Sequence, residues 1–193
     1  VINAGDGCHS HPTQALLDAY TVDETVEDLE GKKVVIAGDI LHSRVARATS
    51  RCLNKLGMDV GFFGPGTLLP DYTPDYVEKF YNFEDVFDWN PDVLYLLRLQ
   101  LERQKANFFP NKREYHNKFG VTLERFKELR DRGTYVMHPG PVNRGVELVD
   151  EVMEYDRSLI DQQVENGIAV RMSLLYLLSP ASQGSGFSVE DVV

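Results

Sequence analysis

The segment Val34–Asp39 reads VVIAGD, four apolar residues that stop at a glycine and an aspartate. A short apolar run bounded in this way is typical of a buried strand in a parallel sheet. A helix is expected next, over residues 43–56, because apolar side chains recur there every three or four residues and Gly57 follows as a stop. A strand followed at once by a helix is the repeating unit of α/β proteins.

The same unit recurs on both sides of this segment. The pattern predicts further strands at residues 59–63, 93–97 and 134–137, and helices at 12–20, 122–132 and 158–178. Strands that alternate with helices predict an α/β fold, an open parallel sheet with helices on both faces in a three-layer sandwich. The Ser- and Gly-containing residues 179–193 are expected to form a flexible tail.

Composition narrows the classes of partner. The 193 residues carry a net charge of -10 without a run of five basic residues, which argues against nucleic acid and anionic membranes. Apolar runs are too short to span a bilayer, and a signal-peptide pattern is absent, so a cytoplasmic protein is expected. Cys8 and Cys52 fit no ligand spacing and are interpreted as free thiols. His9 and His11 are interpreted as a loop pair, so neither a metal nor a cofactor is predicted.

Polar residues stand where three of the predicted strands end. Arg44 opens the helix after the first strand, Arg98 follows the strand at 93–97, and His138 follows the last one. Open sheets bind ligands at the carboxyl ends of their strands, and arginine grips carboxylates with two hydrogen bonds. These residues indicate a small dianionic ligand, although each arginine could instead be a solvated loop residue and His138 a hydrogen-bonded core residue. GxGxxG, P-loop and GxSxG motifs are all absent from the sequence.

Four motifs together resemble one enzyme family. They are Val1–Gly7 (VINAGDG) with His11–Gln14 (HPTQ), Gly38–Arg44 (GDILHSR), Leu97–Arg103 (LRLQLER) and His138–Glu147 (HPGPVNRGVE). In this order they resemble the C-terminal, aspartate-binding half of the aspartate carbamoyltransferase catalytic chain, over residues 1–178. The sister family, ornithine carbamoyltransferase, is expected to carry a cysteine in its HPxx motifs, where this chain has Thr13 and Gly140.

The resemblance implies transfer of the carbamoyl group from carbamoyl phosphate to L-aspartate in pyrimidine (UMP) biosynthesis, without a metal or organic cofactor. It implies that His11 hydrogen-bonds the carbonyl oxygen of carbamoyl phosphate as the catalytic donor. It implies that Gln14 and the backbone of Pro139, Gly140 and Pro141 bind the carbamoyl amide, and that Arg44 and Arg98, with Gln100 supporting Arg98, bind the carboxylates of aspartate.

The family's other half carries an STRTR-type phosphate-binding helix start, and this sequence has no counterpart to it. Because the chain opens at Val1 without an initiator Met, it is expected to be a fragment or half-enzyme that is inactive alone. The missing domain would join it in cis or in trans, and the complete protein would form a homotrimer, with or without regulatory or dihydroorotase chains. Two alternatives stay open: a non-catalytic binding or scaffolding module of the same fold, and an unrelated nucleotide-binding domain.

Overall fold

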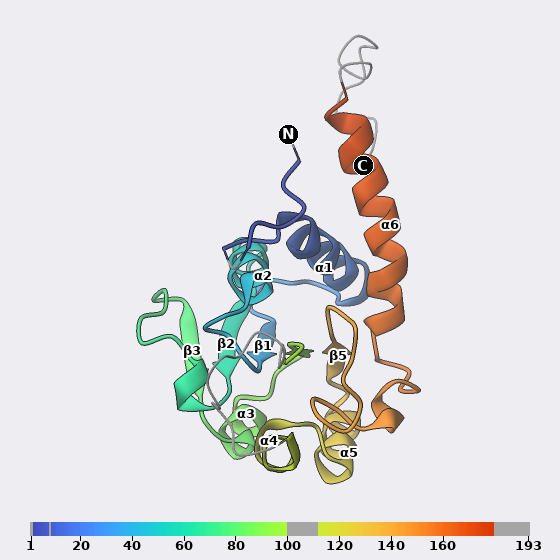
Figure 1. Ribbon diagram of the computed structural model, residues 1–193. Coiled ribbons are helices and arrows are strands. Elements are labelled where there is room, and N and C mark those ends of the chain that lie inside the picture. Colours follow the sequence, from blue (N-terminus) through green and yellow to red (C-terminus); the bar gives the residue numbers. More distant parts are fainter. Residues whose placement is uncertain (1, 8, 100–111, 180–193) are drawn as a thin grey trace.

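A five-stranded parallel sheet forms the centre of the molecule. The computed structural model describes residues 2–7, 9–99 and 112–179 (Figure 1). The sheet order is β3-β2-β1-β4-β5, and every neighbouring pair is parallel. This arrangement confirms the predicted α/β fold. The strands are β1 (Lys33–Ala37), β2 (Asp59–Phe63), β3 (Val77–Phe80), β4 (Val93–Leu96) and β5 (Tyr135–Met137).

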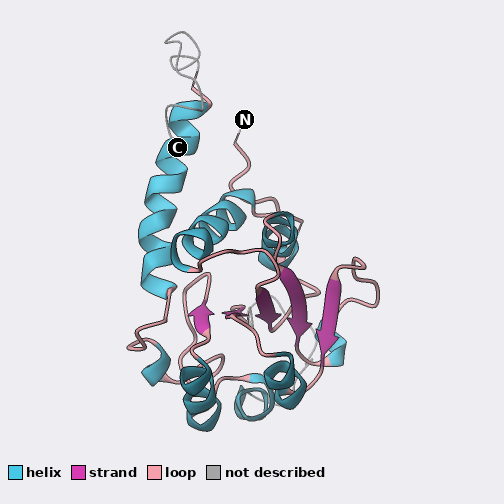
Figure 2. Ribbon diagram, turned by 180° about the vertical axis from the view of Figure 1, so that it is seen from behind, coloured by secondary structure: helices cyan, strands magenta, loops and turns pink. Residues whose placement is uncertain are grey.

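Helices cover both faces of the sheet, as Figures 1 and 2 show. One face carries α1 (Pro12–Thr25) and α2 (Arg44–Lys55), and α6 (Ile160–Leu177) packs along α1. The other face carries α3 (Phe83–Trp89), α4 (Lys112–Phe119) and α5 (Leu123–Arg132). Two 3-10 turns, η1 (Gly66–Leu68) and η3 (Asp150–Val152), complete the described elements. The result is the three-layer sandwich expected from the sequence.

The central strand β1 shows how the sequence produces two cores. Successive side chains of a strand point to opposite faces of its sheet. Val34 and Ile36 pack with buried residues of α1 and α2, whereas Val35 and Ala37 pack with those of α3 and α5. All four are almost fully buried. An apolar run without polar interruptions is therefore what a strand covered on both faces requires.

The predicted helix at 12–20 is too short. α1 continues to Thr25, because Thr21 and Val22 are fully buried and the Thr21 hydroxyl donates to the Leu17 carbonyl at 2.7 Å. Asn166 of α6 also donates to the Thr21 hydroxyl, at 3.0 Å. The charged residues after Tyr20 suggested the end of the helix, but residues 21–25 continue α1, which packs against α6.

Three elements were not predicted from the sequence. They are the edge strand β3, the seven-residue α3 and α4. β3 reads VEKF, so two charged residues interrupt the apolar pattern of an edge strand that pairs on one side only. By contrast, α2 and α5 begin where expected, because Ser43 and Thr122 accept hydrogen bonds from backbone N–H groups at the helix starts.

Along most of its length, α6 presents an apolar stripe to solvent. Val164, Ile168, Met172 and Leu175 recur at helical spacing and are 63 to 65% exposed. Figure 1 shows this helix extending past α1, away from the sheet. In the part of the chain that the structure describes, no helix is both long and apolar enough to cross a membrane. The predicted tail lies outside the described residues apart from Ser179.

Candidate active site

Three adjacent strands end at one edge of the sheet, and the predicted site residues follow them. β1 lies between β2 and β4, and β4 lies between β1 and β5. The chain leaves β1 toward Arg44 and β4 toward Arg98. It leaves β5 toward the segment His138–Pro141, which we call the proline loop. We call this side of the sheet the carboxyl edge. The structure therefore places both arginines and the proline loop after neighbouring strands, as the strand-end rule predicts.

Arg44 is the first residue of α2 and is half-buried. The helix start is fixed by Ser43, whose hydroxyl accepts from the Ala46 N–H at 3.1 Å. The guanidinium of Arg44 lies against Gly5, where a β-carbon would come within 2.6 Å of its Nη1. Gly5 also has φ of +135°, a backbone conformation that favours glycine, and a side chain at this position would displace the end of the Arg44 side chain. This contact brings residues 2–7 to the carboxyl edge.

His11 occupies the N-cap position of α1 without a side-chain capping hydrogen bond, and its side chain is half-buried. Burial lowers the pKa of His11, and the positive charges of Arg44 and Arg171 lower it further. The ring is therefore neutral near pH 7 and has one N–H to donate. Arg171 comes from α6, and its role beside His11 was not predicted, since it lies 160 positions further along the sequence.

Gln14 lies one helical turn further into α1 and is buried. Its amide nitrogen donates to Asp18 Oδ1 at 3.0 Å. Asp18 is fully buried, and nothing in the local sequence pattern distinguishes it from a solvated helical aspartate. The sequence analysis missed it for that reason.

A buried carboxylate ties the segment after β4 to the loop after β5. Glu147 Oε1 accepts from the Leu99 N–H at 2.8 Å, and its Oε2 accepts from the Asn143 N–H at 2.8 Å. The Asn143 side chain donates to Glu147 Oε1 at 2.7 Å and to the Leu99 carbonyl at 3.3 Å. Burial raises the pKa of Glu147, and these hydrogen bonds oppose that shift. We call these hydrogen bonds among Glu147, Asn143 and Leu99 the latch. The latch fixes the backbone beside Arg98 against the proline loop.

The loop His138–Pro141 is held by its own histidine. His138 Nδ1 accepts from the Gly140 N–H at 2.9 Å, and the His138 N–H donates to Gln163 Oε1 at 2.9 Å. Gly140 has φ of +66°, which favours glycine, and it is followed by a cis peptide bond to Pro141. Burial, with the nearby charge of Arg98, lowers the pKa of His138 to about 4. His138 is thus a hydrogen-bonded core residue, the second of the two interpretations left open by the sequence.

Burial is the larger cause of the lowered pKa at both histidines, and arginine charges lower it further. Arg44 and Arg171 act on His11, and Arg98 acts on His138. Both rings therefore sense a positive field at the carboxyl edge, although the whole chain has a net charge of -10. A positive field in a partly buried setting favours an anionic ligand. Gln100, the remaining predicted site residue, lies outside the described residues.

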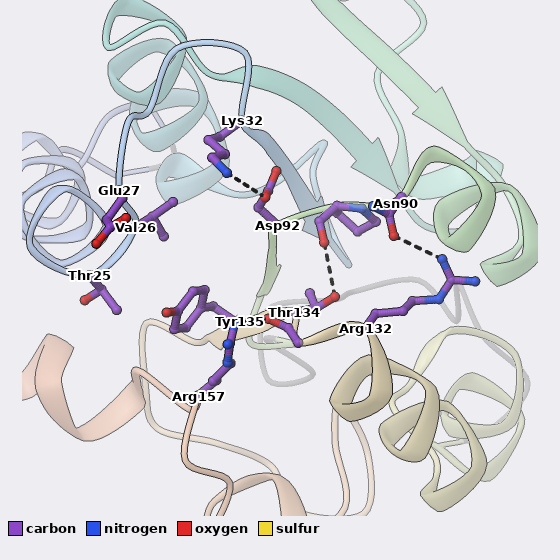
Figure 3. Close-up of a pocket in the computed structure, with 12 residues that line it drawn as sticks. Thr25, Val26, Glu27, Lys32, Asn90, Asp92, Arg132, Thr134, Tyr135 and Arg157 are labelled. Carbon is purple, nitrogen blue, oxygen red and sulfur yellow. Dashed lines mark hydrogen bonds and ion pairs between the residues drawn. The ribbon is translucent and has the colours of Figure 1, made fainter.

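The opposite, amino edge of the sheet contains a cavity of about 320 Å³. Two contacts within its lining involve charged side chains: Lys32 lies 3.5 Å from Asp92, and Arg132 donates to Asn90 at 3.1 Å (Figure 3). Arg157 donates to the Gly133 carbonyl and stacks over the Tyr135 ring. None of the predicted site residues lines this cavity.

Residues 2–7, 9–99 and 112–179 contain no cluster of three His, Cys, Asp or Glu side chains suited to a metal. Cys52 is a free thiol, as expected, and Cys8 lies outside the described residues.

The fold and the carboxyl edge define an α/β domain whose ligand site lies at the ends of parallel strands. Comparison with known proteins specifies the family. The model of the aspartate/ornithine carbamoyltransferase Asp/Orn binding domain matches residues 30–178. The chain belongs to this family, which confirms the resemblance seen in the four sequence motifs.

Curated relatives are named aspartate carbamoyltransferase catalytic subunit. The relative from Akkermansia muciniphila is 57% identical over 183 residues, which cover 95% of this chain and 59% of the relative. The relative from Desulfitobacterium hafniense (strain DSM 10664 / DCB-2) is 49% identical over 179 residues, which cover 92% and 57%. The chain thus spans less than two thirds of the length of these relatives.

Solved structures give the same fold. The catalytic subunit of M. jannaschii aspartate transcarbamoylase matches with a TM-score of 0.74 and 28% identity, over 94% of this chain and 60% of that one. The Trypanosoma cruzi enzyme in complex with carbamoyl aspartate and phosphate matches with a TM-score of 0.72 and 26% identity, over 90% and 57%.

Proposed function

We propose that this chain supplies the aspartate-binding part of an aspartate carbamoyltransferase of pyrimidine biosynthesis. The reaction joins the carbamoyl group of carbamoyl phosphate to the amino group of L-aspartate and releases phosphate. The observation that carries the proposal is the positive field at the carboxyl edge, where Arg44 and Arg98 follow adjacent strands beside two histidines of lowered pKa. Relatives of the same name, at up to 57% identity, support it.

Each predicted residue then has a chemical task. The amino nitrogen of aspartate attacks the carbonyl carbon, a C–N bond forms, and negative charge develops on the carbonyl oxygen. A neutral His11 donates a hydrogen bond to that oxygen, an effect worth about 3 kcal/mol for one positioned donor. The C–O bond to phosphate then breaks, and the leaving phosphate takes the electron pair of that bond and accepts the proton that the aspartate nitrogen loses.

Binding and orientation use the other predicted residues. Arg44 and Arg98 pair with the two carboxylates of aspartate, with Gln100 supporting Arg98. Gln14 Oε1 and the backbone carbonyls of the loop Pro139, Gly140 and Pro141 accept from the carbamoyl amide, which has only N–H donors to offer. Holding the amine and the carbonyl carbon about 3 to 3.5 Å apart supplies much of the rate enhancement.

A second domain is needed for the phosphate. The sequence contains no STRTR-type phosphate-binding helix start. The chain covers 59% of the Akkermansia muciniphila relative, so a part of that relative has no counterpart in the matched region. We place the phosphate site in a domain that corresponds to that part. This domain joins residues 1–178 either in a longer polypeptide or in a complex. The complete protein is proposed to be a cytoplasmic homotrimer.

We propose that the carbamoyl-phosphate domain packs against the apolar stripe of α6. Val164, Ile168, Met172 and Leu175 offer a contiguous apolar face that the described residues leave exposed. Ile168→Asp should lower the thermal midpoint of the longer polypeptide and leave that of the 193-residue chain unchanged. An equal effect in both proteins would show that nothing docks there.

The proposed function is tested by assaying N-carbamoyl-L-aspartate with two proteins. One is the catalytic chain extended to the length of its relatives, and the other is the 193-residue chain. We expect product only from the extended protein, because half a site cannot orient both reactants. Product formation by the 193-residue chain would contradict the requirement for a second domain. Absence of product from the extended protein would contradict the function itself.

A further inference from the structure

The most completely buried acidic side chain of α1 receives four hydrogen bonds from four elements. Asp18 has no exposed surface. Its Oδ1 accepts from the Gln14 amide of α1 at 3.0 Å and from the Gln163 amide of α6 at 2.8 Å. Its Oδ2 accepts from the Thr49 hydroxyl of α2 at 2.9 Å and from the Tyr95 hydroxyl of β4 at 2.8 Å.

The bond from Gln14 fixes which end of its amide faces the site. A glutamine amide has a donor NH₂ at one end and an acceptor oxygen at the other, and an ionised carboxylate accepts only. Asp18 therefore selects the NH₂ of Gln14 and directs Oε1 the other way. An acceptor oxygen is what a carbamoyl NH₂ requires.

The amide of Gln163 is oriented by Asp18 in the same way, and it contacts the proline loop after β5. Its NH₂ is bound by Asp18, so its Oε1 is the end that accepts from the His138 N–H at 2.9 Å. His138 in turn accepts from the Gly140 N–H through Nδ1. The network therefore runs from Asp18 through two side chains to the backbone of the proline loop, which the proposed function places at the carbamoyl amide.

The charge of Asp18 is what keeps both amides in this orientation. Burial raises the pKa of Asp18 to about 6, and the bonds from Gln163, Tyr95, Gln14 and Thr49 lower it in opposition. The titratable groups facing it are Tyr95 of β4 and Cys52 of α2, and its charge raises the pKa of both. A protonated Asp18 would hold the two NH₂ groups less strongly, because hydrogen bonds to an ionised acceptor are roughly twice as strong as those to a neutral one.

We propose that Asp18 is a positioning residue of the carbamoyl site, whose carboxylate orients Gln14 directly and the His138–Pro141 loop through Gln163. This assignment rests on the proposed function. It explains why a charged group is kept in the interior between α1, α2, β4 and α6, where a packed apolar residue would avoid the cost of desolvation. A purely structural role for the carboxylate predicts effects on folding alone.

The test uses the extended catalytic chain carrying Asp18→Asn. Asparagine keeps the shape but loses the charge. Its one oxygen accepts from the two glutamine NH₂ groups only as a weaker, neutral acceptor, and its NH₂ then faces the Thr49 and Tyr95 hydroxyls, which donate to Oδ2 in the wild type. We expect kcat/KM for carbamoyl phosphate to fall about 100-fold, the loss that a displacement of about 1 Å causes at a reacting centre. The KM for aspartate should change little. The matched control is Asp23→Asn, the same change on the exposed face of α1.

A second variant has a readout, the position of the acid limb of the pH profile, that a loss of stability alone would not move. Tyr95→Phe removes one hydrogen bond to the charged carboxylate and leaves both glutamine contacts in place. The pKa of Asp18 should then rise, so the acid limb of the pH–kcat profile should move to higher pH while the plateau stays unchanged. Tyr72→Phe, at a side chain that is 96% exposed, is the matched control.

The outcomes separate this inference from the proposed function. An active wild-type protein whose Asp18→Asn and Asp23→Asn variants have equal kinetic constants would overturn the positioning role only. If Asp18→Asn does not fold, coincident acid limbs for Tyr95→Phe and wild type would overturn it. Inactivity of the wild-type extended protein toward carbamoyl phosphate and aspartate would overturn the proposed function and this assignment with it.

Discussion

The two edges of the sheet differ in what their charged groups bind. At the amino edge, Lys32 and Asp92 pair with each other, and Arg132 is bound by Glu128 and Asn90 around a cavity of about 320 Å³. At the carboxyl edge, Arg44 and Arg98 lie beside histidines and lower the pKa values of those rings. Lys32 and Asp92 neutralise each other at the amino edge, whereas the histidines at the carboxyl edge sense the positive charges of nearby arginines. A positive field where parallel strands end favours an anionic ligand.

The largest expected effect comes from removing the donor at the carboxyl edge. In the extended protein, His11→Ala should lower kcat by roughly 100-fold or more, because one positioned donor to a developing oxyanion is worth about 3 kcal/mol. The KM for aspartate should change less. Steady-state rates at varied aspartate check this. A kcat within a few fold of wild type would remove His11 from the chemistry.

Arg98→Ala tests the same edge through binding. Loss of a charge-assisted pair to a carboxylate should weaken aspartate by about 3 kcal/mol, or roughly 100-fold in KM, with a much smaller change for carbamoyl phosphate. Arg157→Ala removes an arginine that lines the amino-edge cavity and serves as the matched control. Equal effects on the two substrates would mean that the roles of Arg98 and His11 are misassigned.

The pH dependence of stability should reveal His138. Its pKa is about 4 in the folded chain and 6.5 in the unfolded chain, so the unfolded state binds the proton first as pH falls. Stability of the wild type relative to His138→Asn should therefore be constant above pH 6.5 and fall by roughly 3 kcal/mol on going to pH 4. The raised pKa of Asp18 makes its contribution to stability change with pH in the opposite direction. Asp18 is present in both proteins, so this contribution cancels in the difference between them. Denaturant unfolding at several pH values gives the difference, and a pH-independent difference would contradict the assignment.

The latch between the loops after β4 and β5 should have a smaller effect. Asn143→Ala removes side-chain bonds to Glu147 and to the Leu99 carbonyl, at an expected cost of about 2 kcal/mol of stability. KM for aspartate should rise with it, because Leu99 adjoins Arg98. Asn117→Ala, on the exposed side of α4, is the control for denaturant unfolding and kinetics. An unaltered KM in a destabilised Asn143→Ala protein would separate the latch from the site.

The smallest effect is expected at the amino edge. Lys32 and Asp92 are both about one third exposed, so their pair is screened by water, and Lys32→Ala should cost less than about 1 kcal/mol. Activity should be unchanged. A large loss of carbamoyl transfer in this variant would show that the amino-edge cavity matters after all.

Local patterns were sufficient to predict most of the fold. The apolar runs that form β1, β2 and β4 stand out because these strands are covered on both faces. The edge strand β3 carries Glu78 and Lys79 within four residues, which conceals it. The extension of α1 to Thr25 depends on contacts with α6, some 140 residues away, and these leave no local signal.

The candidate site shows the same division between local and distant information. Arg44, Arg98 and the proline loop were predictable because each follows a strand, and parallel strands end at one edge. The roles of Asp18, Gln163 and Glu147 were not, because they arise from partners 25 to 145 positions away. Asp18 and Gln163 lie outside the four motifs, and Glu147 ends the fourth one without any local sign that it is a buried hydrogen-bond acceptor.

The most direct measurement compares Arg44→Ala with Arg157→Ala in the extended catalytic chain. Both changes remove one arginine from the same domain, at opposite edges of the sheet. The initial rate of N-carbamoyl-L-aspartate formation, with aspartate held below its KM, is measured for each. The account predicts a loss of roughly 100-fold for Arg44→Ala, from a lost carboxylate pair, and a rate close to wild type for Arg157→Ala. Equal rates for the two variants, or a larger loss for Arg157→Ala, would contradict it.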